Sequence, residues 1–182
     1  MQIGLTGEKG MNEAADLSVL PKRLASLRGP TTKRSAVAII NRLAFLAAGD
    51  GQKPIPLEIN SPGGVAAEAL RILRVMDHTS CPIPTFCRGE ARGMAIVIAA
   101  HGFRGFRAAA PDCRFSFSTG LPEEQEALSE EVVAILLKDA AKGEMELRRW
   151  LETGAEFSAE EALRLGLIDA SSPKPLFPRP GD

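Results

Sequence analysis

Two glycine-rich segments contain the residues of this sequence best placed to do chemistry. The first is Asn60-Ser61-Pro62-Gly63-Gly64 and the second is Gly89-Glu90-Ala91-Arg92-Gly93. Each follows a short apolar stretch and precedes a segment with helical periodicity. We therefore expect strand-to-helix junctions, where α/β proteins bind ligands. Glycine allows sharp turns, and the N–H groups of such turns can hold an anion or a developing oxyanion, so these segments favour stabilisation of negative charge by the backbone.

Common catalytic and ligand-binding motifs are missing. The sequence has no G-x-x-x-x-G-K-[ST] phosphate loop and no G-x-G-x-x-G after a strand. The second segment has the frame of a G-x-S-x-G nucleophile elbow, but Ala91 stands at its centre. The cysteines Cys81, Cys87 and Cys113 show no C-x-x-C spacing, and there are only two histidines. We therefore predict no metal, no cofactor and three reduced, buried thiols.

Composition indicates an ordinary globular protein. The 182 residues are 45% hydrophobic, and 22 basic residues nearly balance 23 acidic ones, so no basic face for nucleic acid is expected. The longest uninterrupted apolar run, Met94 to Ala100, is far shorter than the ~18 residues of a membrane span. The first residues lack the apolar region of a signal peptide. We expect a cytoplasmic protein that binds neither nucleic acid nor membranes.

Hydrophobic periodicity predicts short strands at residues 24–27, 55–60, 82–87, 115–118 and 167–169. Helices are predicted at 35–48, with Ser35 as N-cap and Gly49 beyond the end, and at 65–77, 94–100, 129–141 and 145–152. A last short helix has Ser158 as N-cap and ends at Gly166. This alternation predicts one α/β domain of right-handed βαβ units over residues 17–170. Residues 1–16 are expected to form a flexible arm, and residues 171–182 an extended Pro-rich tail.

The most specific motif is the run Ile59-Asn60-Ser61-Pro62-Gly63-Gly64-Val65, with Gly89-x-Ala91 further on. Leu27-Arg28-Gly29 precedes it, and Phe157 to Ala162 and Gly166 to Asp169 follow near the end of the sequence. These segments resemble the family of ClpP, the proteolytic subunit of the Clp protease, whose I-N-S-P-G-G-V motif the first run reproduces. The resemblance covers about residues 20–169. It implies the ClpP/crotonase-like fold of repeated ββα units.

The resemblance implies a serine peptidase with a Ser-His-Asp triad, but the three matching positions carry other residues. Gly93 stands at the serine position, Ser118 at the histidine position, and Trp150, counted back from the closing motif, at the aspartate position. Glycine has no nucleophile, serine is no general base near neutral pH, and an indole cannot orient an imidazole. The two histidines, His78 and His101, lie at the wrong ends of their predicted helices to replace the base. We therefore predict no catalytic residues and no peptidase activity.

The backbone part of the site does not depend on these side chains. In the family that the chain resembles, the oxyanion hole consists of the N–H groups that match Gly64 and Met94. The turn Asn60-Ser61-Pro62-Gly63 supports the first of them. We therefore expect a site that keeps the donors for a carbonyl oxygen without the groups that cleave the adjacent bond.

The resemblance also implies an assembly. Family members form rings, and a strand and a long helix, the handle, dock one ring on another. The matching stretch, residues 119–149, is shortened and contains the acidic run Glu123-Glu124-Gln125-Glu126, so we expect no docking of two rings. The predicted helix 129–141 is apolar on more than one face, which favours a lateral subunit interface. We expect a homo-oligomer, with an active family member or a peptide as further partners.

Two other functions remain open at this point. A crotonase-type acyl-CoA enzyme shares the fold and uses two backbone donors, and Gly89-x-Ala91-x-Gly93 resembles its G-x-A-x-G-G motif. Glu68 or Glu90 would then be the candidate base, although the residues after Gly93 are not glycines. A hydrolase with a relocated nucleophile would instead use Ser61 or Cys87.

Overall fold

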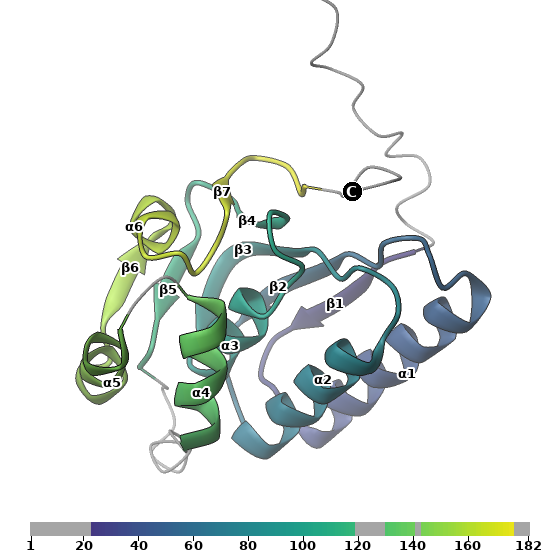
Figure 1. Cartoon of the computed structure of the whole chain (residues 1–182), viewed down its shortest axis with the longest axis horizontal. Coiled ribbons are helices and arrows are strands. Elements are labelled where there is room, and N and C mark those ends of the chain that lie inside the picture. Colours follow the sequence, from purple (N-terminus) through teal and green to yellow (C-terminus); the bar gives the residue numbers. More distant parts are fainter. Residues whose placement is uncertain (1–22, 119–129, 141–142, 177–182) are drawn as a thin grey trace, which may run out of the picture.

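The long strand β3 (Thr85–Arg92) lies at the centre of the sheet that organises this fold (Figure 1). The computed structural model describes residues 23–118, 130–140 and 143–176. The other strands are β1 (Ala25–Arg28), β2 (Leu57–Ser61), β4 (Arg107–Ala109), β5 (Arg114–Ser116), β6 (Glu156–Ser158) and β7 (Ala170–Ser171). The helices are α1 (Lys33–Gly49), α2 (Ala66–His78), α3 (Met94–Ala100), α4 (Glu130–Asp139), α5 (Glu144–Thr153) and α6 (Ala159–Arg164).

Most strand pairings in the described sheet are parallel. The strand order is β1-β2-β3-β4-β7, and β3 has two neighbours on one side, because its first half pairs with β4 and its second half with β5. Among the described strands only β5 and β6 run antiparallel. Parallel neighbours need a crossover connection, which α1, α2 and α3 supply between successive strands. This arrangement confirms the predicted α/β class of repeated strand–helix units.

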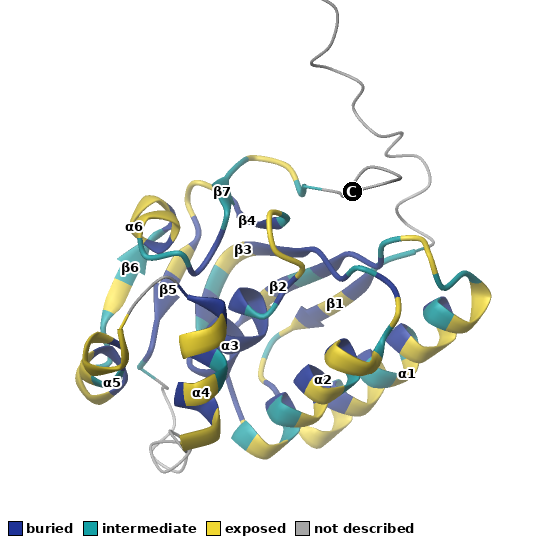
Figure 2. Ribbon diagram, viewed as in Figure 1, coloured by how far each residue is buried: buried dark blue, intermediate teal, exposed yellow. Residues whose placement is uncertain are grey.

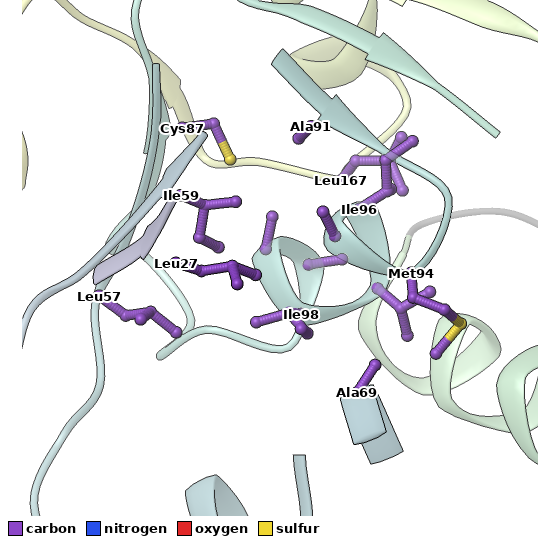
Figure 3. Packing of buried hydrophobic residues seen from close by; sticks show 14 of the residues in the cluster. Leu27, Leu57, Ile59, Ala69, Cys87, Ala91, Met94, Ile96, Ile98 and Leu167 are labelled. Atoms are coloured by element: carbon purple, nitrogen blue, oxygen red, sulfur yellow. The ribbon is translucent and has the colours of Figure 1, made fainter. Parts of the chain in front are cut away.

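Helix α3 is buried on all sides, and much of the core surrounds it. Its seven residues are all buried, as the dark blue ribbon of α3 in Figure 2 indicates. Figure 3 shows side chains of α3 among Leu27 and Ile59 of the sheet and Leu167 of the C-terminal segment. A helix that is apolar all round needs cover on every side. This packing fixes the position of the first residue of α3, Met94.

Helices α1 and α2 lie side by side and turn amphipathic faces toward the core (Figures 1 and 2). Their buried residues recur at helical spacing: Ala36, Ile39, Leu43 and Leu46 in α1, and Ala69, Ile72, Leu73 and Met76 in α2. The outer face of α1 leaves large apolar side chains uncovered, with Phe45 71% exposed and Val37 37% exposed.

The start of α1 differs from the prediction. Thr32, not Ser35, is the N-cap: the Thr32 hydroxyl accepts a hydrogen bond from the Ser35 N–H at 3.2 Å. The Ser35 hydroxyl accepts one in return from the Thr32 N–H at 2.8 Å, so Ser35 is the third helical residue of a capping box. At the other end, Gly49 belongs to the helix and Asp50 is the C-cap.

Several predicted strands also need correction. Strand β3 continues past Cys87 to Arg92, and the short strands β4 and β6 were not predicted at all. The predicted strand 167–169 is wrong, because pairing with β4 begins only at Ala170. Leu167 and Ile168 are nevertheless buried, which explains their apolar pattern. The Asp169 carboxylate is occupied by Arg107, which donates to it at 2.6 and 2.9 Å.

The predicted capping box of α6 and the predicted burial of the three cysteines are confirmed. Ser158 caps α6 through a capping box with Glu161, and Gly166 adopts a left-handed φ of 75° just after that helix. The three cysteines are free and buried. No helix among the described residues combines the length and the apolar character that crossing a membrane requires.

Helix α4 buries Val132, Val133 and Leu136 within the subunit and leaves Leu137 37% exposed. Less of its apolar surface is therefore free for a lateral interface than the sequence indicated, and that interface stays a prediction. The acidic run 123–126, the arm 1–16 and the tail beyond Leu176 lie outside the described residues.

Candidate functional site

The turn Ser61-Pro62-Gly63-Gly64 is held from two sides by hydrogen bonds. On one side, the buried Ser61 hydroxyl accepts from the Gly63 N–H at 3.2 Å. On the other side, the Thr31 N–H donates to the Gly63 carbonyl at 2.6 Å, and the Val65 N–H donates to the Thr31 carbonyl at 2.8 Å. Thr31 is fully buried, so the predicted turn is fixed against the segment that follows β1.

Gly64 has no room for a side chain. A Cβ at this position would overlap the Thr31 carbonyl oxygen and lie 2.5 Å from the Thr31 nitrogen, and the Gly64 φ of +144° disfavours other residues as well. The glycine is therefore required by backbone contact with Thr31. Sequence reasoning missed Thr31, because its role depends on a contact between segments more than thirty positions apart.

Asn60 shapes the course of β3 toward the second turn. The pairing of β2 with β3 is irregular at this point, since Ile59 pairs with Cys87 but Ser61 pairs with Ala91. The Asn60 Oδ1 accepts from the Glu90 N–H at 3.3 Å, and a Cβ on Gly89 would lie only 2.9 Å from that oxygen. Gly89 thus lies within the strand and not at a strand-to-helix junction as predicted. Irregular pairing bends a strand and redirects the residues after it.

The two glycine-rich segments meet at Gly63 and Gly93. A Cβ on Gly63 would lie 2.8 Å from the Arg92 carbonyl oxygen and 3.5 Å from the Gly93 Cα. The Gly93 N–H donates to the Ser116 carbonyl at 2.8 Å, which adds the end of β5 to the same region. Among the described residues, neither the Gly64 N–H nor the Met94 N–H donates to a backbone carbonyl. Both of the predicted donors therefore lie on turns that touch each other.

Gly93 precedes α3 as its N-cap, with φ of 49° and ψ of −125°. Residues with a side chain rarely adopt such a conformation, and when they do it costs of order 1–3 kcal/mol. Gly93, which the sequence predicts to stand at the serine position, thus has a special backbone geometry and no side chain.

Ser118 lies next to Gly154, the left-handed C-cap of α5. A Cβ on Gly154 would lie 3.0 Å from the Ser118 Cβ. The ring of Trp150 is occupied elsewhere, because it packs on Phe117 and Phe157 with centroid distances of 6.3 and 5.2 Å. A side chain at 154 would therefore touch one at 118. The match of Trp150 to the third triad position stays a prediction, and position 154 is an alternative to it.

Neither histidine lies at these turns. The seven residues of helix α3 lie between Gly93 and His101, so these two are about 12 Å apart along the helix at ~1.5 Å per residue. His101 contacts two carboxylates, with 2.6 Å between Nδ1 and Asp139 Oδ2. His78 is exposed at the end of α2, with its Nδ1 2.6 Å from the Arg74 carbonyl oxygen. Both therefore lie at the helix ends where the sequence analysis placed them.

The candidate relocated nucleophiles are inaccessible. Ser61 and Cys87 are both fully buried. A hydrogen bond with Cys113, together with burial, raises the pKa of the Cys87 thiol well above its usual value. A thiol whose pKa is raised carries little thiolate and is a poor nucleophile.

The two candidate crotonase bases lie in different surroundings. Glu68 lies in the first turn of α2, where it accepts a 2.7 Å hydrogen bond from Arg71. Glu90 lines a hollow of about 660 Å³ together with Arg92, Arg114 and Glu156. No cluster of His, Cys, Asp or Glu suited to a metal ion occurs in the described ranges.

Comparison with known families agrees with the motifs of the two turns. A family model described as Clp protease matches residues 8–123, which is more than half of the chain and includes Asn60–Gly64, Gly93 and Ser118. On this match the chain belongs to the Clp protease family.

Proposed function

We propose that this Clp protease family member has no peptidase activity and acts as a structural or peptide-binding subunit of an oligomer. The observation that carries the proposal is Gly93, which occupies the head of α3 with a φ of 49° and no side chain. In a serine peptidase, loss of the nucleophile or of the base alone costs about 10⁶-fold in rate.

The surroundings of Gly93 support the same conclusion. Ser118 lies next to Gly154, and neither can act as a general base or orient one. The two histidines of the chain, His78 and His101, are held at the far ends of their helices. Burial of Ser61 and Cys87 argues against a substitute nucleophile.

The backbone N–H donors leave the proposed subunit able to bind a carbonyl oxygen. The N–H groups of Gly64 and Met94 lie on adjoining turns and lack backbone acceptors among the described residues. Two such donors are what an oxyanion hole provides. We therefore propose that the site can hold a peptide carbonyl passively, and that the chain serves alone or together with an active family member.

The oligomer is supported by the exposed apolar side chains of α1, Phe45 and Val37. We expect self-association through lateral contacts into a single ring or a smaller closed oligomer, without stacking of two rings, because the handle region is short. Sedimentation velocity at low and high salt measures this, and the oligomer should persist at high salt because its contacts are apolar. A monomer at micromolar concentration contradicts the lateral contacts, and a double ring contradicts the argument from the handle.

Activity is tested with short fluorogenic peptides and the purified full chain. We expect release of the fluorophore no faster than in buffer, at any peptide concentration. A Phe45→Ala variant, assayed in the same way, is the control for an effect of assembly on the result. It alters the proposed interface and leaves the two turns unchanged. Turnover by the unmodified chain that follows saturation kinetics would overturn the proposal.

A further inference from the structure

His101 joins three helices through two hydrogen-bonded carboxylates. It is the C-cap of α3, and its side chain is only 8% exposed. Its Nδ1 lies 2.6 Å from Asp139 Oδ2, at the end of α4, and its Nε2 lies 2.9 Å from Asp77 Oδ1, in the last turn of α2. We call the three residues Asp77, His101 and Asp139 the histidine bridge.

The carboxylates of the bridge differ in burial. The side chain of Asp139 is 9% exposed, whereas that of Asp77 is 51% exposed. Water can therefore solvate Asp77 when it loses its partner, but it cannot solvate Asp139 in the same way. A buried carboxylate without a hydrogen-bond donor is costly, so the state of His101 matters most for Asp139.

Other charged groups around the bridge come from each neighbouring element. From the loop after α3, Arg104 donates to the Lys138 carbonyl of α4. From β4, the buried Arg107 donates to the Asp139 carbonyl at 2.8 Å, and its own charge is paired with Asp169. At the end of α2, the ring of His78 contacts the Arg74 carbonyl of its own helix. Cys81, which follows α2 in the sequence, lines a surface hollow together with His101.

The number of ring protons decides how many carboxylates His101 can satisfy. The imidazolium has two N–H donors, one for each carboxylate of the bridge, whereas the neutral ring has one donor and one lone pair. Loss of a single proton therefore leaves one of the two carboxylates facing a lone pair. Because water can solvate Asp77 but not Asp139, the neutral ring keeps its one N–H toward Asp139. Asp139 then loses the positive charge of its hydrogen-bond partner, which weakens the attachment of the end of α4 to α2 and α3.

We propose that the histidine bridge is a pH-sensitive contact that holds the C-terminal end of α4 against α2 and α3 while His101 is protonated. When the ring loses its proton, the last turn of α4 loosens. The rest of the helix stays in place, because Val132, Val133 and Leu136 remain buried in the core.

The direction of the pH effect follows from the surroundings of His101. The hydrogen bond that His101 donates to Asp139 raises the pKa of His101 above its usual 6.5, burial opposes this, and the charges of Asp139 and Asp77 add to the increase. Since the folded-state pKa is the higher one, the stabilisation is fully present below about pH 6.5 and is lost as the pH rises through the folded value. As the pH rises through this range, the equilibrium constant for opening the last turn of α4 should increase by up to about tenfold per pH unit.

Titration of the two histidines by NMR is the first part of the test. The chain has only His78 and His101, so His78→Gln leaves a single signal to assign. We expect His101 to titrate above pH 6.5 and Asp139→Asn to lower its pKa, because the amide removes the negative charge. A His101 signal that titrates at or below pH 6.5, or that is unaffected by Asp139→Asn, would overturn the proposal.

Hydrogen exchange of the α4 amides, corrected for the intrinsic rate, is the second part. From about pH 6 to 9 the protection of the last turn of α4 should fall in the full chain and in the His78→Gln control. In His101→Gln it should already be low at pH 6 and should stay constant. A fall in protection that persists in His101→Gln contradicts the proposal, as does constant protection in the full chain. If His101→Gln does not fold, Asp139→Asn takes its place in the same comparison.

Discussion

Replacing Gly64 with alanine is expected to destabilise the protein by roughly 2–6 kcal/mol, the sum of backbone strain and overpacking. The new Cβ would overlap the Thr31 carbonyl oxygen, and it would do so at a φ of +144°. This overlap can be relieved only if Thr31 moves. The backbone hydrogen bonds of Thr31 with Gly63 and Val65 hold it in place. Since domains are stable by only about 5–15 kcal/mol, much of the protein should be unfolded or aggregated at 37 °C.

Thermal unfolding of Gly64→Ala beside Gly29→Ala measures this effect. Gly29 also has a positive φ, 78°, but a Cβ there meets nothing within 4 Å. The control therefore bears only the cost of a left-handed alanine, about 1–2 kcal/mol. We expect a fall in Tm on the order of 10 °C for Gly64→Ala and a few degrees for Gly29→Ala. Equal Tm values for the two variants would mean that the contact with Thr31 does not constrain the turn.

Rebuilding a triad should create peptidase activity where none exists. The variant Gly93→Ser with Ser118→His and Gly154→Asp restores a nucleophile, a base and an orienting carboxylate at positions in the same region. A general base contributes about 10²–10⁴-fold, so we expect this variant to hydrolyse fluorogenic peptides at least about 100-fold faster than Gly93→Ser alone. Aspartate is among the residues that tolerate the left-handed backbone of position 154, where φ is 64°.

The matched control carries Trp150→Asp in place of Gly154→Asp. That change removes a buried ring from its contacts with Phe117 and Phe157, which costs about 3–5 kcal/mol. It should give no activity and a lower Tm. Activity in the Trp150→Asp variant but not in the Gly154→Asp variant would support Trp150, the residue predicted from the sequence, as the third position. Hydrolysis by Gly93→Ser alone would reveal a base that the account of the site does not contain.

Local sequence signals were sufficient for the elements that depend on local interactions. Helix α3 was predicted with its exact bounds because all its residues are apolar, and the α6 capping box needs only residues 158–161. The start of α1 was less clear, because Thr32 and Ser35 both offer a hydroxyl and only the observed bonds distinguish cap from partner.

Short strands and the details of the site depend on contacts between distant segments. Strands β4 and β6 have three residues each and exist because β3, β5 and β7 lie beside them, which no window of sequence encodes. The same holds for Thr31, which fixes Gly64 across a gap of thirty-three positions. It holds as well for Gly154, where a Cβ would lie 3.0 Å from that of Ser118, thirty-six positions earlier. Motif matching located Gly93 and the turn Asn60–Gly64, since these lie in continuous segments.

The central claim is that the chain lacks a working nucleophile, and covalent labelling tests it most directly. The purified protein is incubated with a serine-directed phosphonate and with a β-lactone, and its intact mass is measured at intervals. The account predicts an unchanged mass after times that fully label an active serine peptidase, because Gly93 has no side chain and Ser61 is buried. A stoichiometric adduct on any serine of the chain would contradict it.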